Sequence, residues 1–104
     1  MFEVVVNKCH GGFGLSKKAL EMIAELKGVN IGVGDAAYYN FERTLARHDK
    51  HLVSVVKKLG KDANEVYSKL AIVTIDLPVY KLETFDGLEC IVELDERGWI
   101  VITD

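Results

Sequence analysis

The sequence has little proline, little cysteine and no long apolar run. One proline and nine glycines among 104 residues are too few for a low-complexity or collagen-like chain. The longest apolar runs, such as residues 4–6, fall far short of the roughly 20 residues that cross a bilayer. The first residues also lack the basic and apolar regions of a signal peptide. We therefore expect a cytosolic protein with no membrane association and, from its length, a single domain over residues 1–104.

Basic residues are not in excess, since 13 Lys and Arg stand against 16 Asp and Glu, for a formal net charge of −3. This balance argues against binding of duplex nucleic acid, which needs a clustered basic surface, but a small anionic ligand needs only a few donors. Cys9 and Cys90 form no CxxC pair, and in a reducing cytosol we expect both to be free and buried. The scattered histidines His10, His48 and His51 predict no metal site, and no cofactor is expected.

The first half of the chain predicts a strand and two helices. Apolar and β-branched residues predict a strand over Phe2–Asn7, buried on both faces near its middle. After a glycine turn, Ser16 should cap a helix that ends at Gly28, and Asp49 should cap a second helix that ends at Gly60. The expected buried faces are Ala19, Leu20, Ile23, Ala24 and Leu26 on the first helix, and Leu52, Val53, Val55, Val56 and Leu59 on the second.

Between the two helices, residues 30–43 favour no single element. Gly32 and Gly34 favour a loop, whereas Tyr38, Tyr39 and Phe41 could form a short strand or an aromatic flap. Aromatic residues in such a segment suit a small-molecule site or a subunit interface as well as the core.

The final third of the chain predicts β-structure. A strand over residues 70–76 ends before Pro78, and strands over 80–85 and 88–94 flank a two-residue hairpin turn, Asp86-Gly87. A second turn at 95–98 should lead into a strand over 99–103. The predicted fold class is α+β, with a mixed or antiparallel sheet of four or five strands, two helices on one face and a C-terminal β-meander.

The segment from Lys8 to Ser16, Lys-Cys-His-Gly-Gly-Phe-Gly-Leu-Ser, resembles the opening motif of a family of small bacteriophage and prophage proteins. In that family a strand leads into Lys-Cys-Tyr-Gly-Gly-Phe and a Leu-Ser helix start. Weaker similarities follow at Arg47-His48-Asp49 with Leu52-Val53, at Leu59-Gly60 with Ala63-Asn64, and at Phe85-Asp86-Gly87 with Glu89.

Two departures from the family pattern stand out. His10 replaces a tyrosine, which puts a role for a phenol there in doubt, and Thr84-Phe85 replaces a glutamate-tyrosine pair. Residues 30–44 are not matched. The family has no established function as a whole. The resemblance implies a phage accessory protein that acts in the host cytosol, where it alters host physiology or blocks a host defence.

The glycine turn is the strongest candidate for a ligand site. A helix N-terminus leaves backbone N–H groups unpaired, and glycines let an anion such as phosphate approach them closely. Lys17 and Lys18 add positive charge, and Phe13 could stack on a base. The candidate ligand-binding residues are Lys8, His10, Gly11, Gly12, Phe13, Gly14, Ser16 and Arg47. The turn matches neither the P-loop nor the Rossmann pattern, and the alternative is a tight turn whose Phe13 fills the core.

Arg47 suits bidentate contacts with phosphate or carboxylate. It could pair with Asp49 or another neighbouring acid, or it could face the glycine turn. Asp49 itself is more simply explained as a helix cap.

Catalytic residues are not predicted. Cys9 and His10 are neighbours on an extended chain, so their side chains should point to opposite faces. In the hairpin, Thr84 should pair with Glu89 and Glu83 with Cys90. The two glutamates would then face opposite sides, with Glu89 on the solvent side, and would form no acid–base pair.

These features predict a binding protein, not an enzyme, that sequesters a small phosphate-bearing, nucleotide-derived ligand at the glycine turn. Because ligand pockets need about 300 Å³ or more, we expect a homo-oligomer with sites between subunits. The alternative is a protein-interaction module that inhibits a host enzyme through its acidic surface, an exposed edge strand or the Tyr38-Tyr39 flap. A third reading is a small hydrolase or transferase that uses Cys9, His10 or Glu89.

Overall fold

The computed structural model describes residues 1–92 and 100–102 and confirms the α+β class. Within these residues no helix has the length and apolar character needed to cross a membrane. The elements, in chain order, are β1 (Phe2–Asn7), α1 (Lys17–Lys27), α2 (Asp35–Arg43), α3 (Lys50–Leu59), the 3₁₀ turn η1 (Gly60–Ala63), β2 (Leu70–Ile75), β3 (Val79–Phe85), β4 (Leu88–Val92) and β5 (Ile100–Val101).

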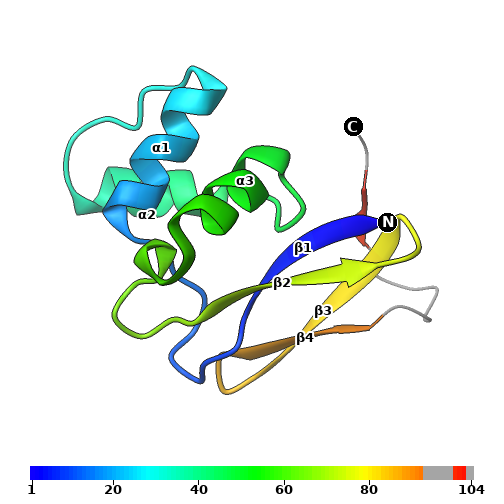
Figure 1. Ribbon diagram of the computed structural model, residues 1–104. Helices are drawn as coiled ribbons and strands as arrows, with labels where there is room; N and C mark the ends of the chain where they lie inside the picture. The colour runs from blue at the N-terminus through cyan, green and yellow to red at the C-terminus, as the bar shows by residue number, and fades with distance from the viewer. Residues whose placement is uncertain (93–99, 103–104) are drawn as a thin grey trace.

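The antiparallel pair β1–β2 lies between two other layers (Figure 1). The helices cover one of its faces, and Val5 packs there in a core built mainly from α1 and α3. Val4 and Val6 point the other way and pack with Tyr80 of β3. All three valines are fully buried, so β1 is buried on both faces, as its unbroken β-branched run predicts. Burial of each stabilises the fold by roughly 1.5–3 kcal/mol.

The two helices expected from the sequence are confirmed, with their caps. The Ser16 hydroxyl accepts the N–H of Ala19, and α1 ends at Gly28, whose φ of 70° lies in the left-handed region. At α3, the Asp49 carboxylate accepts the backbone N–H groups of the first turn, and Gly60 follows the last residue. One expected core residue is wrong, because Leu26 lies on the outer side of α1 with 52% of its surface exposed.

A third helix, α2, occupies the segment for which we expected a loop, a short strand or an aromatic flap. It begins directly after Gly34, and Asp35 lies in its first turn, where a negative charge complements the helix dipole. Tyr38 and Phe41 stand three residues apart, which places both on one helix face, and both pack against the helical core. Gly32 and Gly34 therefore lie in the loop before the helix, and the loop ends where α2 begins.

The C-terminal strands do not form the expected meander. The order is β4-β3-β5, so β3 is central and β5 pairs with it, not with β4. β4 pairs with Lys81–Phe85 along one edge of β3, and β5 pairs with Val79 and Tyr80 along the other edge. The turn expected at residues 95–98 lies outside the described part of the chain.

The expected single sheet is also wrong, since β1–β2 and β4-β3-β5 form two separate sheets. The backbone N–H groups of β1 that point away from β2 do not pair with β4. The N–H of Val5 donates to the carbonyl of Arg47 (2.8 Å), and the N–H of Asn7 donates to the Glu89 carboxylate (2.9 Å). A loop carbonyl and a side chain thus take the place of a strand along this edge.

Candidate functional site

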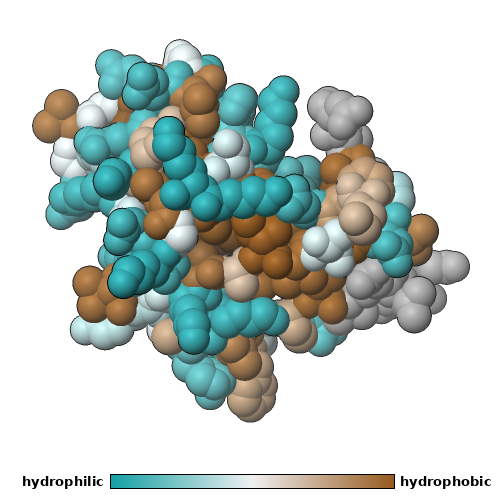
Figure 2. All heavy atoms as spheres, viewed as in Figure 1, coloured by the Kyte–Doolittle hydropathy of each residue, from teal (hydrophilic) through white to brown (hydrophobic). Residues whose placement is uncertain are grey.

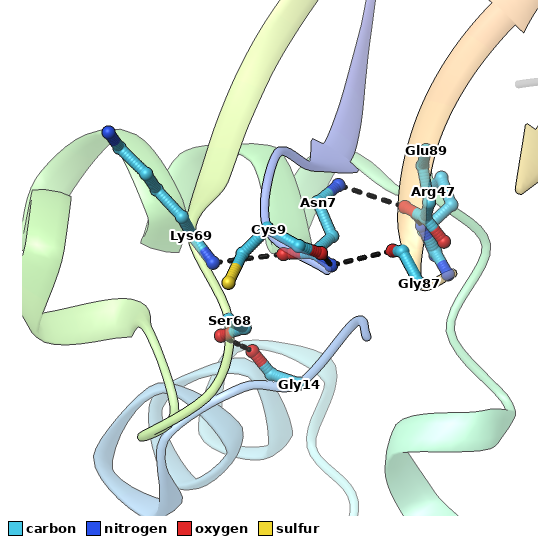
Figure 3. A network of polar contacts seen from close by, with 8 residues as sticks. All are labelled: Asn7, Cys9, Gly14, Arg47, Ser68, Lys69, Gly87 and Glu89. Carbon is cyan, nitrogen blue, oxygen red and sulfur yellow. Dashed lines mark hydrogen bonds and ion pairs between the residues drawn. The ribbon is translucent and has the colours of Figure 1, made fainter. Parts of the chain in front are cut away.

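Asn7, the last residue of β1, is fully buried and binds three other segments of the chain (Figure 3). Its side-chain amide donates to the carbonyls of Cys9 (2.5 Å) and Gly87 (2.8 Å), and its Oδ1 accepts the backbone N–H of Lys69 (2.9 Å). The side chain therefore uses both amide hydrogens and its oxygen, which is the condition for burying a polar group at low cost. It fixes the glycine turn, the loop before β2 and the β3–β4 hairpin to one another.

Glu89 on β4 is buried beside Asn7, contrary to the expectation that it faces solvent. Its side chain is 7% exposed and forms an ion pair with Arg47, whose side chain is 19% exposed. The hairpin register is as predicted, with Thr84 opposite Glu89. What covers this position is the loop that carries Arg47, and no periodicity in the sequence shows that this loop crosses the hairpin.

Arg47 also reaches the glycine turn, one of the alternatives that the sequence leaves open. Its guanidinium carbon lies 3.6 Å from the centroid of the Phe13 ring. Such contacts stabilise a cation by about 0.5–2 kcal/mol, depending on how far it is removed from water. Asp49 does not pair with Arg47; it caps α3 and forms an ion pair with Lys27 (2.5 Å). Burial tends to raise the pKa of Asp49, but Lys27 and the capped N–H groups outweigh it and hold that pKa below its ordinary value.

The glycines of the turn serve close packing between loops. A Cβ on Gly11 would overlap the backbone of Tyr67, and one on Gly87 would overlap the backbone of His10. Gly12 has open space around it but takes a φ of 94°, which favours glycine. The carbonyl of Gly14 accepts the hydroxyl of Ser68 (2.7 Å). The alternative of a tight structural turn therefore accounts for most of the glycine motif.

Groups of the chain itself bind part of the N-terminus of α1. The Ser16 hydroxyl accepts the N–H of Ala19 (3.2 Å) and donates to the carbonyl of Asp62 (2.8 Å). The N–H of Leu15 donates to the Glu42 carboxylate (2.7 Å). An anion bound at this helix terminus would have to compete with Glu42.

The outer side of the turn carries exposed aromatic rings. Gly11 brings Tyr67 against the turn, and the ring of His10 meets that of Phe85 edge to face, with 6.5 Å between their centroids. Tyr67 is 72% exposed and Phe85 74% exposed, and Lys8, which opens the turn, is also exposed. We call His10, Tyr67, Phe85 and Lys8 the loop tip. Tyr67 stands in no motif, so the sequence offered no signal for it.

A small hollow of about 230 Å³ lies on the inner side of the turn. Phe13 and Arg47 line it together with Arg43 and Tyr39 of α2, whose guanidinium and ring are 5.7 Å apart. Glu42 and Tyr39 line both this hollow and a second one of about 400 Å³, which Lys17, Asp35 and Tyr38 also line. The structure thus brings two of the expected ligand-binding residues, Phe13 and Arg47, into one hollow, whereas His10 and Lys8 lie on the outer side.

The thiols of Cys9 and Cys90 are free; Cys9 is half-buried and Cys90 is exposed, so the expected burial of both is only partly met. Within residues 1–92 and 100–102, no group of three or more His, Cys, Asp or Glu is placed to hold a metal ion. His48 donates to or accepts from the hydroxyl of the buried Tyr80 (2.8 Å), a contact on the far side of the β1–β2 sheet from the helical core.

Comparisons of the chain with protein-family models, with curated proteins and with solved structures found no match in any of the three.

The Arg47–Glu89 pair yields a first prediction. Arg47→Ala leaves a buried carboxylate without its cation and should lower the free energy of unfolding by about 3 kcal/mol, measured by urea denaturation. The double variant Arg47→Met, Glu89→Gln should recover most of this loss, because it removes the buried charge and keeps an acceptor for the N–H of Asn7. The matched control is Lys17→Ala, which breaks an exposed ion pair with Asp35 (side chains 69% and 89% exposed) and should cost far less stability, because solvent screens the pair. Equal losses for the two single variants would contradict this assignment.

Glu42 gives a prediction about pH. Burial raises the pKa of this carboxyl, Glu65 raises it further, and the Leu15 N–H and Arg47 only partly oppose the shift. Since the folded state holds this proton more tightly than the unfolded chain, stability should fall as pH rises from about 4.3, the ordinary value, through the raised pKa. Glu42→Gln keeps an acceptor for the Leu15 N–H and removes the titration.

We therefore expect the difference in unfolding free energy between Glu42→Gln and the wild type to shift in favour of the variant as pH rises, and to level off above the raised pKa. Urea titrations between pH 4 and 8 measure it. A difference that stays flat, or that shifts the other way, would show that Glu42 does not carry a raised pKa.

Proposed function

We propose that this protein is a non-catalytic binding protein that engages a protein partner through the loop tip. The observation that carries the proposal is the display of exposed aromatic rings on loops that are held in fixed positions. Tyr67 and Phe85 together present large apolar surfaces to solvent, and aromatic side chains are enriched among the residues that dominate protein–protein binding.

The fixed geometry of these loops favours binding. Asn7 joins all three loops through hydrogen bonds, and the close approaches at Gly11 and Gly87 leave little room for them to separate. A surface that is already ordered loses less conformational entropy when a partner binds. Rings on rigid loops are also the arrangement that antibody binding sites use.

A protein partner fits this surface better than a small molecule does. The rings of Tyr67 and Phe85 stand out from the surface, and neither of the hollows beside α2 includes them. Small molecules are usually held in concave sites that enclose most of their surface. The resemblance of the glycine motif to small phage proteins adds the setting: we propose that the partner is a host protein and that the chain acts as a phage accessory factor.

The test is quantitative affinity capture from host lysate, with variants of the loop tip. We expect the double variant Tyr67→Ala, Phe85→Ala to capture at least tenfold less of a specific partner than the wild type does. Its far-ultraviolet circular dichroism spectrum should stay unchanged. The matched control is Tyr39→Ala, which removes an exposed ring (59% exposed) from α2. Equal capture of the partner by the wild type, the double variant and the Tyr39→Ala control would contradict the assignment to the loop tip. An equal loss of capture in both variants would contradict it too.

A second candidate function is sequestration of a small phosphate-bearing, nucleotide-like ligand. Its supporting observation is the hollow at Phe13, where the guanidinium groups of Arg43 and Arg47 lie with two aromatic rings. The charge available there is limited, because Arg47 is paired with Glu89 and Glu42 lines the same space. The volume of about 230 Å³ would enclose a phosphate and leave an attached base largely uncovered.

Native mass spectrometry with a panel of cyclic and ADP-ribose-type nucleotides tests this second candidate. Binding that is lost in Arg43→Ala and kept in Lys50→Ala would support it, because both residues are exposed cations and only Arg43 lines the hollow at Phe13. Absence of binding to the wild type, or equal loss in both variants, would exclude this hollow as the site.

A further inference from the structure

The outer edge of β2 carries backbone groups that bind no other strand among the described residues. In the β1–β2 ladder, the N–H of Lys8 donates to the carbonyl of Lys69 (2.7 Å), so this pair is hydrogen-bonded. Since hydrogen-bonded pairs alternate along an antiparallel ladder, Leu70, Ile72 and Thr74 direct their N–H and carbonyl groups away from β1. The N–H of Leu70 confirms this direction, because it donates outward to the Asn64 side chain (2.9 Å).

Beyond Leu70, the outward edge of β2 meets no other strand in the part of the chain that the structure describes. Among residues 1–92 and 100–102, β2 has β1 as its strand neighbour and no strand on its other side. Within the same residues, no hydrogen bond joins the outward groups of Ile72 or Thr74 to another segment. Thr74 is exposed and Ile72 is half-buried, so a strand laid along this edge would reach both.

This edge also lacks the features that keep strand edges apart. The sequence Leu-Ala-Ile-Val-Thr-Ile contains no charged residue, no proline and no glycine, and four of its six residues are β-branched. Figure 2 shows hydrophobic residues gathered over β1 and β2 on this face, with hydrophilic residues on either side of them. An exposed strand edge of this composition is unstable against pairing with another strand.

We propose that the outer edge of β2 pairs with β2 of a second copy of this chain in a twofold-symmetric dimer. Two identical strands that run antiparallel about an axis beside Val73 place Ile72 of one copy opposite Thr74 of the other. This register satisfies the outward N–H and carbonyl groups of both residues in each copy. Because the strand is uncharged, no like charges meet across the axis.

A second copy suits this edge for two reasons beyond hydrogen bonding. β1–β2 is a two-stranded sheet, which is marginal by itself, and pairing would extend it to a continuous sheet through both subunits. The half-buried Val73 of one copy would lie opposite Val73 of the other, and the half-buried Ile72 side chains would form a diagonal pair across the axis. The dimer uses no residue of the loop tip, so it is independent of the function proposed above.

Sedimentation velocity over a range of concentrations tests the dimer. We expect the wild type to reach twice the 11.6 kDa chain mass at micromolar concentration. Thr74→Lys should weaken association at least tenfold, because it brings two positive charges to the axis. Thr74→Pro should act similarly, since it removes an outward N–H that the β1 ladder does not use. Ser54→Lys adds the same charge to the exposed side of α3 and should leave the dimer intact.

Hydrogen exchange on the wild type identifies the surface without any variant. The amides of Ile72 and Thr74 should be protected at high concentration and should exchange rapidly on dilution to the monomer. A strictly monomeric wild type, fast exchange of both amides at every concentration, or a dimer that persists in Thr74→Lys and Thr74→Pro would each overturn the proposal. If the protein is monomeric alone and these amides become protected only with a host partner, the edge belongs to that partner instead, and the dimer is wrong.

Discussion

A carboxylate in a protein interior is stable only when its charge and its lone pairs are matched. Glu89 meets this condition through Arg47 and the backbone N–H of Asn7, and both come from segments distant in sequence. The same contacts fix the end of β1, the hairpin and the loop before α3 in one arrangement. They also explain why β1 and β4 do not join into one sheet, since the Glu89 side chain occupies the place where a strand-to-strand hydrogen bond would form. The two-sheet architecture therefore depends on a buried ion pair with a hydrogen-bonded neighbour.

The glycine turn takes its shape from this arrangement. Asn7 holds the turn through the carbonyl of Cys9 and holds the hairpin through the carbonyl of Gly87, and the glycines allow the resulting close approach. On the inner side of the turn, the Phe13 ring lies against the Arg47 guanidinium, and the N–H of Leu15 donates to Glu42. On the outer side, His10, Tyr67 and Phe85 are exposed. In the folded chain the glycine motif allows close packing of the turn against the backbone of Tyr67 and against the hairpin.

The elements that local patterns specify were predictable from the sequence, and the contacts between distant segments were not. β1 follows from its β-branched run, α1 and α3 from their caps and apolar spacing, and the hairpin register from Asp86-Gly87. α2 was missed because two glycines precede it, although Tyr38 and Phe41 have helical spacing. The burial of Glu89 and the role of Asn7 were missed because each depends on a loop that crosses from elsewhere. Of the expected site residues, Phe13 and Arg47 do lie together, but the exposed ring of Tyr67 belongs to no motif.

Amide hydrogen exchange by nuclear magnetic resonance in the single variant Glu89→Gln tests most directly whether the buried carboxylate holds the loops together. The variant keeps the shape of the side chain and an acceptor oxygen, and it removes only the charge that binds Arg47. The account predicts that protection falls together at the amides of Val5, Asn7, Lys8 and Lys69, while the amides within α1 and α3 keep theirs. Unchanged protection at these four amides, or a uniform loss throughout the chain, would show that the loops are held together by something other than the charge on Glu89.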